Sequence, residues 1–579
     1  MATEQSLNYL KDFGNHRLNA VLVYERQKNT SESLRTASTG FTIPGYNLDG
    51  LQDAVNVEPT VSNAFESSIE SFLARVQYDA FNKYLLTASL RYDGSSRFAS
   101  GDKQWGYFPS VGLAWRISNE PFLMGNSVIS DAKFKFSFGE SGNTQIPTFQ
   151  SKSAADGAGY IFNGGTLTPG ASIIRLANDN LSWEKTREVD FGLTLGLFDD
   201  RITMEADYYD KETKDLLLAV PVPVTSGYQT VFKNLGLVSN KGFEFSLNAN
   251  IVDKRDLKWN MNFNISTNKN KVLDLGGADE FYVTSIGGGG VNNDYVIRVG
   301  ESLGSIHGLA YDGVYTYDDF VEFDGMTLEE ATAAFKADEA ALADAGMWWT
   351  MNDYTLKDGV PVNATVTNGT YRPGMTKFKD QLTIDTDGDG VPDAADGIIN
   401  DDDRHIIGNT LPKHFGGMTQ NISYKNFDFS VQTAWSYGND VYNKTMRKGA
   451  NTAVPWRNKF DIVKNAWTPD NPTGTWTGFS GGGPSGDVGS AAYDVFIEDG
   501  SFFRIANMTL GYKLPKNILK QIRMSSLRLY VSVDNVHIWT KYSGWDPDVS
   551  VGNNQLTPGL DADAYPRART FRTGIVARF

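Results

Sequence analysis

The sequence contains no cysteine among its 579 residues. Disulfide bridges, thiolate metal sites and cysteine nucleophiles are therefore excluded. Basic residues are also outnumbered, since 53 Lys and Arg stand against 69 Asp and Glu, which gives a formal net charge of −16. Binding to nucleic acid depends on clustered Lys and Arg that contact phosphates. We therefore expect no nucleic-acid partner.

Long apolar runs are missing as well. No segment reaches the roughly 18 consecutive apolar residues that a membrane-spanning helix needs, which excludes a helical membrane protein. The first residues, Met1 to Ser6, show neither the basic region nor the apolar region of a signal peptide. If the protein is exported, we expect this sequence to be a fragment or a mature form.

Glycine, with 57 residues, and aromatic residues, at 12%, are abundant. This composition is typical of a protein with many strands and turns. Apolar residues recur at every second position in many short segments, as at Val189, Phe191 and Leu193. In 243–251 and 257–265, the positions between the apolar residues hold Asn, Ser, Glu and Lys. This alternation predicts β-strands with one apolar and one polar face.

The polar faces are too wet for a sandwich core, but they suit a water-filled lumen. The apolar faces would then meet lipid, and such strands must close into a barrel because lipid cannot hydrogen-bond backbone groups. We count about 14 to 16 candidate strands. The predicted fold is all-β, an antiparallel transmembrane β-barrel portion with short periplasmic turns, such as 81–83 and 199–200, and long extracellular loops. The longest loop is expected at about 313–415, and within it Thr327 and Glu330 form a capping-box pattern that predicts a helix.

Several segments resemble blocks of the SusC/RagA family of TonB-dependent outer-membrane transporters. The first two are RYDGSSRF at 91–98 and GYFPSVGLAWRI at 106–117. The blocks occur in the family's order and span nearly the whole chain. The others lie at 138–143, 181–185, 207–217, 234–244, 401–413, 496–504, 510–512, 534–535, 542–547 and 565–567.

The resemblance implies an outer-membrane barrel of about 22 strands with an N-terminal plug. It implies import of oligosaccharides or peptides, powered by the TonB complex through the plug, with a SusD-type surface lipoprotein as partner and outer-membrane lipid around the barrel. Residues 1–579 are expected to form the C-terminal part of such a barrel. The chain begins in what looks like a mid-barrel hairpin at 7–26, so we expect the signal peptide, the plug and the first strands to be absent.

The sharpest local pattern is an acidic segment whose residues have the spacing of a twelve-residue Ca²⁺ loop. Gly390 stands at position 6, where the loop turns sharply. Position 12 is Asp rather than Glu, so Asp401, Asp402 or Asp403 is an alternative last ligand. We predict Ca²⁺ binding that stiffens an extracellular loop; the alternative is a solvated acidic turn. The predicted ligands are Asp385, Asp387, Asp389, the Val391 carbonyl, Asp393 and Asp396.

Aromatic residues are frequent in the predicted extracellular loops. Exposed rings can stack on sugars or contact a partner lid, whereas the alternative is that they pack small cores within the loops. The candidate ligand or partner residues are Trp348, Trp349, Trp456, Trp467, Trp476 and Phe479.

Motifs of enzymes are missing. The five histidines are scattered without the spacing of a zinc site, and no motif places two carboxylates across a cleft as a glycosidase requires. We therefore expect no catalytic activity. The alternative to a transporter is a calcium-stiffened β-sheet protein for glycan binding or adhesion. That alternative explains the acidic segment and the loop aromatics, but not the repeated apolar strand faces.

Overall fold

The computed structural model describes most of the chain. The described residues are 1–41, 48–99, 101–162, 166–228, 230–285, 293–344, 353–364, 371–389, 391–452, 457–478, 491–552 and 554–579. They divide into two compact units, Met1–Lys241 with Leu273–Gly276 and Gly242–Val272 with Gly277–Phe579. Fifteen long antiparallel strands lie in these ranges, within the predicted number of about 14 to 16. The prediction of an all-β antiparallel fold is confirmed.

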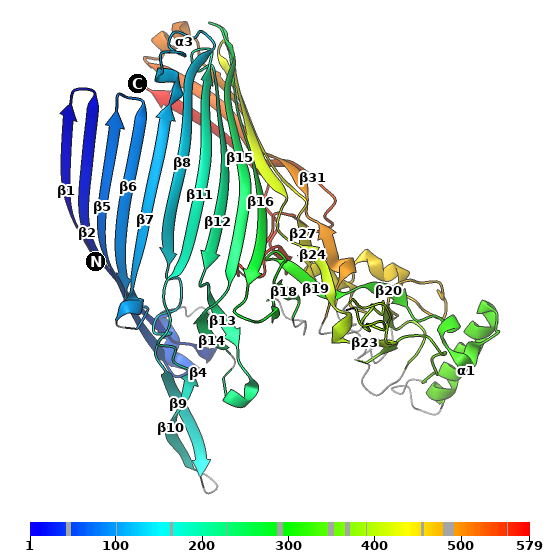
Figure 1. Ribbon diagram of the computed structural model, residues 1–579. Helices are drawn as coiled ribbons and strands as arrows, with labels where there is room; N and C mark the ends of the chain where they lie inside the picture. The colour runs from blue at the N-terminus through cyan, green and yellow to red at the C-terminus, as the bar shows by residue number, and fades with distance from the viewer. Residues whose placement is uncertain are drawn as a thin grey trace. The chain divides into compact units, whose positions relative to one another are not determined.

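In the first unit, neighbouring strands pair in the order β1-β2-β5-β6-β7-β8-β11-β12 and form a wall (Figure 1). The predicted turns at 81–83 and 199–200 connect β5 to β6 and β11 to β12. Strands β2 and β5 pair over 20 residues, about 65 Å of ribbon at about 3.3 Å per residue. The bounds are β1 Ala2–Phe13, β2 His16–Arg35, β5 Val61–Ala80, β6 Tyr84–Ser95, β7 Trp105–Arg116, β8 Ile129–Asn143, β11 Glu184–Leu197 and β12 Ile202–Lys214. Three hairpins extend the links: β3 Ser38–Phe41 with β4 Ala54–Val57, β9 Ala154–Phe162 with β10 Thr166–Arg175, and β13 Leu217–Pro221 with β14 Thr230–Asn234.

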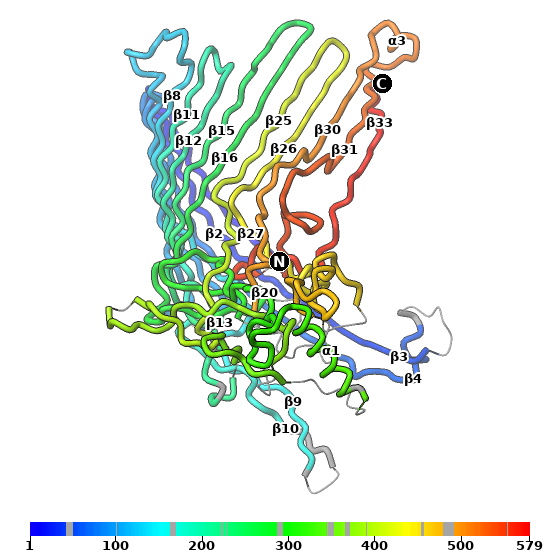
Figure 2. Tube along the Cα trace, turned by 90° about the vertical axis from the view of Figure 1, so that its right-hand side faces the viewer, coloured from blue at the N-terminus to red at the C-terminus, as the bar shows by residue number. Residues whose placement is uncertain are grey.

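The second unit contains a wall in the order β15-β16-β25-β26-β30-β31-β33. The short helix α3 (Lys516–Gln521) links β30 to β31 at one end of these strands, and long links gather at the other end (Figure 2). The wall strands are β15 Leu237–Asp253, whose first residues belong to the first unit, β16 Leu257–Asp274, β25 His414–Tyr424, β26 Phe427–Tyr437, β30 Phe502–Lys513, β31 Ser526–Thr540 and β33 Thr570–Arg578.

The long links of the second unit fold into small sheets and helices, which we call the loop layer. Its core contains Tyr295, Ile306, Tyr442, Phe496 and Leu560, all at most 1% exposed. Its strands are β17 Glu280–Val283, β18 Tyr295–Arg298, β19 Ser305–Leu309, β20 Tyr311–Val314, β21 Val362–Asn363, β22 Thr376–Phe378, β23 Ile398–Ile399, β24 His405–Asn409, β27 Asp440–Asn443, β28 Ala492–Tyr493, β29 Ile497–Asp499 and β32 Leu560–Asp561.

Two longer helices lie in the loop layer, α1 (Leu328–Asp344) and α2 (Lys444–Ala450). The predicted capping box begins α1: the Thr327 backbone N–H and hydroxyl each donate to Glu330 Oε2 at 2.8 Å, and the Glu330 N–H donates to Thr327 Oγ1 at 3.3 Å. The helix prediction at this position is confirmed. None of the helices in the described ranges has the length and apolar character that crossing a bilayer requires.

Each wall has an apolar and a polar face, as the alternation predicts. Phe191 and Leu193 of β11 lie on the apolar face and are 45% and 37% exposed. Ser89 of β6 and Ser110 of β7 lie on the polar face, where their hydroxyl oxygens are 2.7 Å apart. An apolar face that stays exposed over many neighbouring strands suits lipid rather than water. In the second unit, the apolar face includes Phe427, Phe429 and Val431, and the polar face includes Asp428, Ser430 and Gln432.

A glycine in the polar face of the first unit allows an ion pair to cross a whole strand. Lys135 of β8 and Asp207 of β12 lie on either side of β11, with Nζ 3.1 Å from Oδ1. Lys135 also pairs with Glu205. The two side chains meet above Gly192, where a Cβ would lie 2.2 Å from Asp207 Oδ1 and 2.6 Å from Lys135 Cε. A side chain at position 192 would therefore require the ends of these two side chains to move.

The second unit repeats this arrangement. Arg528 of β31 reaches over β30 to Asp428 of β26, and Nε lies 2.9 Å from Oδ1. Gly511 of β30 lies beneath, and a Cβ there would be 2.5 Å from both Asp428 Oδ2 and Arg528 Nη2. In each unit, an ion pair thus joins the outer two of three neighbouring strands by passing over a glycine of the middle strand.

Replacing Gly192 with Ala is expected to destabilise the first unit by about 0.5–1 kcal/mol, because the added methyl group weakens the ion pair while the ends of the two partly exposed side chains move aside. The matched control is Gly112→Ala on the same polar face, since a Cβ at Gly112 would meet nothing within 4 Å. Thermal unfolding of both variants in detergent, followed by heat-modifiable gel mobility, measures the difference. Equal midpoints for the two variants would contradict the proposed role of Gly192.

Candidate functional site

The polar face of the first unit contains a hollow of about 480 Å³. Arg91 lines the hollow. Its Nε donates to both carboxylate oxygens of Asp93 at 2.8 Å, and its Nη2 donates to Ser71 Oγ at 3.0 Å. The Glu25 carboxylate lies 3.7 Å from the same guanidinium. The hollow therefore combines paired charges with hydroxyl groups, and these can hydrogen-bond a polar solute. The residues that line it include Ser89, Arg91, Asp93, Phe108, Ser110 and Trp183.

Aromatic rings close one side of this hollow. Phe108 and Trp183 are 5% and 6% exposed, and their ring centroids are 5.1 Å apart. The Trp183 indole N–H donates to the Gln104 carbonyl at 2.9 Å. The rings pack directly over Gly142, where a Cβ would lie 2.2 Å from Phe108 Cζ. The four segments 91–98, 106–117, 138–143 and 181–185, which the sequence analysis singled out separately, thus meet at one place.

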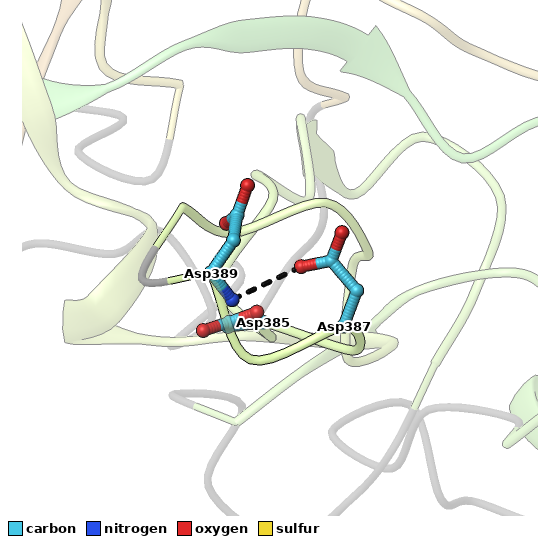
Figure 3. A group of neighbouring side chains, drawn as sticks. All are labelled: Asp385, Asp387 and Asp389. Atoms are coloured by element: carbon cyan, nitrogen blue, oxygen red, sulfur yellow. Dashed lines mark hydrogen bonds between the residues drawn. The ribbon is translucent and has the colours of Figure 1, made fainter.

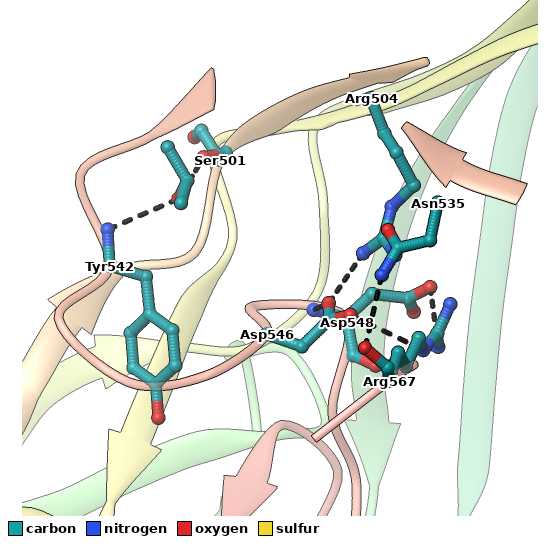
Figure 4. Close-up of polar contacts among 8 residues, drawn as sticks. Ser501, Arg504, Asn535, Tyr542, Asp546, Asp548 and Arg567 are labelled. Atoms are coloured by element: carbon teal, nitrogen blue, oxygen red, sulfur yellow. Dashed lines mark hydrogen bonds and ion pairs between the residues drawn. The ribbon is translucent and has the colours of Figure 1, made fainter. Parts of the chain in front are cut away.

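A second convergence lies in the second unit (Figure 4). Asp546 pairs with Arg504 of β30 and, at 3.3 Å, with Nε of Arg567. Arg567 Nη2 also lies 2.8 Å from Asp548 Oδ2, and Arg504 Nη1 donates to Asn535 Oδ1 at 3.3 Å. We call these five residues the arginine–aspartate cluster. Four of the five residues lie in the segments 496–504, 534–535, 542–547 and 565–567, which are again blocks that the sequence analysis found far apart, and Asp548 directly follows the third.

The loop layer contains a buried ion pair. Lys444 Nζ lies 3.1 Å from Asp294 Oδ2 and 2.8 Å from Ser285 Oγ, with side chains that are 2% and 0% exposed for Lys444 and Asp294. Burial lowers the pKa of Lys444 from its ordinary value, while the Asp294 carboxylate acts in the opposite direction. Because a single buried charge is costly and a pair is tolerated, this contact fixes α2 to the segment before β18.

Three aspartates of the acidic segment come together, as Figure 3 shows. Oxygens of Asp385, Asp387 and Asp389 lie within 4.8 Å of one another, and all three residues are exposed. The Gly388 N–H donates to Asp385 Oδ1 at 2.7 Å, and the Asp389 N–H donates to Asp387 Oδ1 at 3.1 Å. Carboxylate oxygens at this spacing suit a hard cation such as Ca²⁺.

Two of the other predicted ligands, Asp393 and Asp396, accept hydrogen bonds from neighbouring residues. Asp393 accepts from the Thr386 backbone N–H at 2.9 Å and from its hydroxyl at 2.6 and 2.7 Å, and these bonds lower the Asp393 pKa. Asp396 Oδ1 accepts from the Ile398 N–H at 2.8 Å. Val391 is predicted to bind through its carbonyl; its N–H donates to Asp389 Oδ1 at 2.8 Å. Ca²⁺ binding stays a prediction, and the structure gathers three of the five aspartates for it.

Two of the three alternative last ligands, Asp401 and Asp403, have other partners. Asp403 is 1% exposed and accepts from the N–H groups of Gln381 and Asn400, both at 2.7 Å. Asp401 pairs with Arg404 at 2.8 Å. Asp403 therefore anchors the backbone beside the acidic segment.

Comparison with known proteins shows which family the chain belongs to. Residues 3–368 match the family model described as TonB dependent receptor-like, beta-barrel. The chain belongs to this family. TonB-dependent receptor P3 of Formosa agariphila is 31% identical over 100% of this chain and 52% of that protein. TonB-dependent receptor SusC of Bacteroides thetaiotaomicron is 30% identical over 89% of this chain and 44% of that protein.

A solved structure titled as the RagAB peptide transporter superposes with a TM-score of 0.76 at 22% identity, over 100% of this chain and 55% of that chain. This likeness shows the fold. The resemblance to SusC/RagA-type barrels and the outer-membrane location are confirmed. The chain spans about half the length of the curated relatives it matches. TonB-dependent receptors are transporters, so membership favours that class over an enzyme.

The two predicted loop aromatics that the structure describes, Trp467 and Trp476, are packing residues. Trp467 is 3% exposed and contacts Phe335, with ring centroids 5.4 Å apart. Trp476 is 4% exposed, and its indole N–H donates to the Ala450 carbonyl at 2.9 Å. The structure therefore corrects the prediction of ligand-binding rings for these two, because both are enclosed in cores of the loop layer. Trp348, Trp349, Trp456 and Phe479 lie outside the described residues.

Sequence reasoning missed two exposed aromatics beside the arginine–aspartate cluster. Trp545 is 73% exposed and directly precedes Asp546, and Tyr565 is 93% exposed two residues before Arg567. Both occur in blocks that carried the family resemblance. The signal in the sequence that could have found them is that each lies within two residues of a charged residue in the same family block.

Asp387→Asn is expected to weaken Ca²⁺ binding by about tenfold or more, because it removes one of three gathered carboxylates from a hard cation. Asp393→Asn serves as the matched control, since Thr386 already occupies that carboxylate. Calorimetric titration of the protein with CaCl₂ compares the variants. Equal weakening by the two substitutions would show that the segment instead wraps the cation with the full predicted ligand set.

Proposed function

We propose that the chain forms part of the barrel of an outer-membrane importer for oligosaccharides or peptides. In the whole protein, the fifteen described strands would belong to a barrel of about 22 strands. Import would be driven through the TonB complex, and a SusD-type surface lipoprotein would be the partner. The two-faced walls carry this proposal, because an exposed apolar face suits lipid and a charged face suits a water-filled path.

The side chains on the polar faces of the two units support a path for a polar solute. The Lys135–Asp207 pair crosses it in the first unit, and the Arg528–Asp428 pair crosses it in the second. The hollow beside Arg91 offers hydroxyls, paired charges and aromatic edges. Such groups fit sugar hydroxyls as well as peptide amides, so both substrate classes stay within the proposal. The glycan-binding or adhesion alternative is not favoured, because it leaves the exposed apolar faces without a role.

A comparison of growth and uptake tests this function. A strain that lacks the gene for the whole protein is expected to lose uptake of one labelled nutrient class, either an oligosaccharide mixture or a peptide mixture. Uptake in the complemented strain should fall when a protonophore removes the energy that TonB uses. Affinity purification from the outer membrane should also recover a surface lipoprotein.

Unchanged uptake of both nutrient classes in the deletion strain would contradict the proposal. Complementation with the Gly112→Ala variant is the control for expression, because that substitution meets open space on the polar face.

A further inference from the structure

The connection between β31 and β33 is far longer than its ends require. Antiparallel neighbours such as these can be joined by about two residues, yet residues 541–569 lie between them. We call this connection the strap. Long connections in compact folds usually serve a function of their own, so the contacts that hold the strap identify what it does.

One set of contacts fixes the strap to the wall. Arg504 of β30 pairs in register with Ala434 of β26, on the same polar face as Ser430 and Gln432. Its side chain is 6% exposed and reaches Asp546 of the strap, whose side chain is 11% exposed (Figure 4). The strap therefore lies on the polar face, which is the side of the solute path in the proposed function.

Asn535 of β31 connects the two arginines of the cluster. Its amide oxygen accepts from Arg504 at 3.3 Å, and its amide nitrogen donates to the Arg567 carbonyl at 3.2 Å. Asn535 has a φ of +52°, a left-handed conformation that Asn tolerates better than most residues. The wall thus contacts the strap near both of its ends. Arg504 reaches Asp546, and Asn535 reaches the Arg567 carbonyl.

A separate set of contacts fixes the middle of the strap to the loop layer. The Tyr442 N–H donates to the Gly559 carbonyl at 2.9 Å, and the Tyr295 hydroxyl donates to the Pro558 carbonyl at 2.8 Å. Within the strap, the Val551 N–H donates to the Leu560 carbonyl at 3.0 Å. None of these bonds involves a side chain of the arginine–aspartate cluster, so they report on the strap independently of it.

We propose that the arginine–aspartate cluster is a latch that fixes the strap on the polar wall, so that the strap is a static boundary of the solute path and not a moving lid. Asp546 is the centre of the latch because its carboxylate pairs with two arginines at once. Removing its charge leaves Arg504 buried without its carboxylate, which is strongly unfavourable. The statement that the strap borders a solute path rests on the proposed function. The statement that the cluster fixes the strap to the wall does not.

Hydrogen–deuterium exchange of the whole protein tests the latch. In the unaltered protein, the Val551 and Tyr442 amides should be protected to within about tenfold of the wall amides of β25 and β26. Asp546→Asn and Arg504→Gln should each accelerate exchange at Val551 and Tyr442 by about tenfold or more, with β25 and β26 unchanged. The conservative variant Arg504→Lys should give an intermediate rate, because a lysine keeps the charge but not the bond to Asn535.

The matched control is Arg572→Gln. Arg572 of β33 pairs with Asp534 of β31 close to the latch, but its side chain is 57% exposed, so its loss should leave the strap amides unchanged. Wild-type rates at Val551 and Tyr442 in Asp546→Asn would overturn the proposal. So would equal acceleration in β25 and β26, or weak protection of the strap in the unaltered protein. Because the exchange measurement does not depend on transport, it tests the latch even if the uptake experiment contradicts the proposed function.

Discussion

The fold depends on one constraint, which is that a backbone facing lipid finds no hydrogen-bond partner outside the protein. Long antiparallel strands satisfy their backbone groups in register, as β2 and β5 do over 20 residues. Once that pairing is complete, side chains are free to differ on the two faces. The apolar side can stay exposed, as Phe191 does at 45%, because its expected neighbour is hydrocarbon.

The polar face then has to hold its charges without a protein core behind them. Charges on neighbouring strands pair most easily, but Lys135 and Asp207 are separated by a full strand. Glycine at position 192 removes the obstacle, and Gly511 does the same for Arg528 and Asp428. The cost is a weaker β-propensity at each glycine, which the surrounding ladder and the ion pair offset.

Much of the fold could be predicted from sequence, because its signals are local. Period-two alternation depends on adjacent residues, and it located strands such as β11 and β16. The capping box of α1 depends on Thr327 and Glu330, three residues apart. The loop layer could not be predicted in this way, since its cores join residues such as Tyr311 and Trp476 that are remote in sequence. For the same reason, the sequence left open whether Trp467 and Trp476 contact a ligand or pack the loops, and the structure shows both buried.

The site shows the same division between local and remote signals. The acidic segment was found because its carboxylates are close in sequence, yet spacing alone did not show that Thr386 engages Asp393. Arg504 and Asp546 were each noticed only as parts of family blocks, 42 residues apart. Their pairing joins two of these blocks, because the buried charge of Arg504 is stabilised by the carboxylate of Asp546. A contact of this kind joins residues that are remote in sequence, so only the structure shows which residues make it.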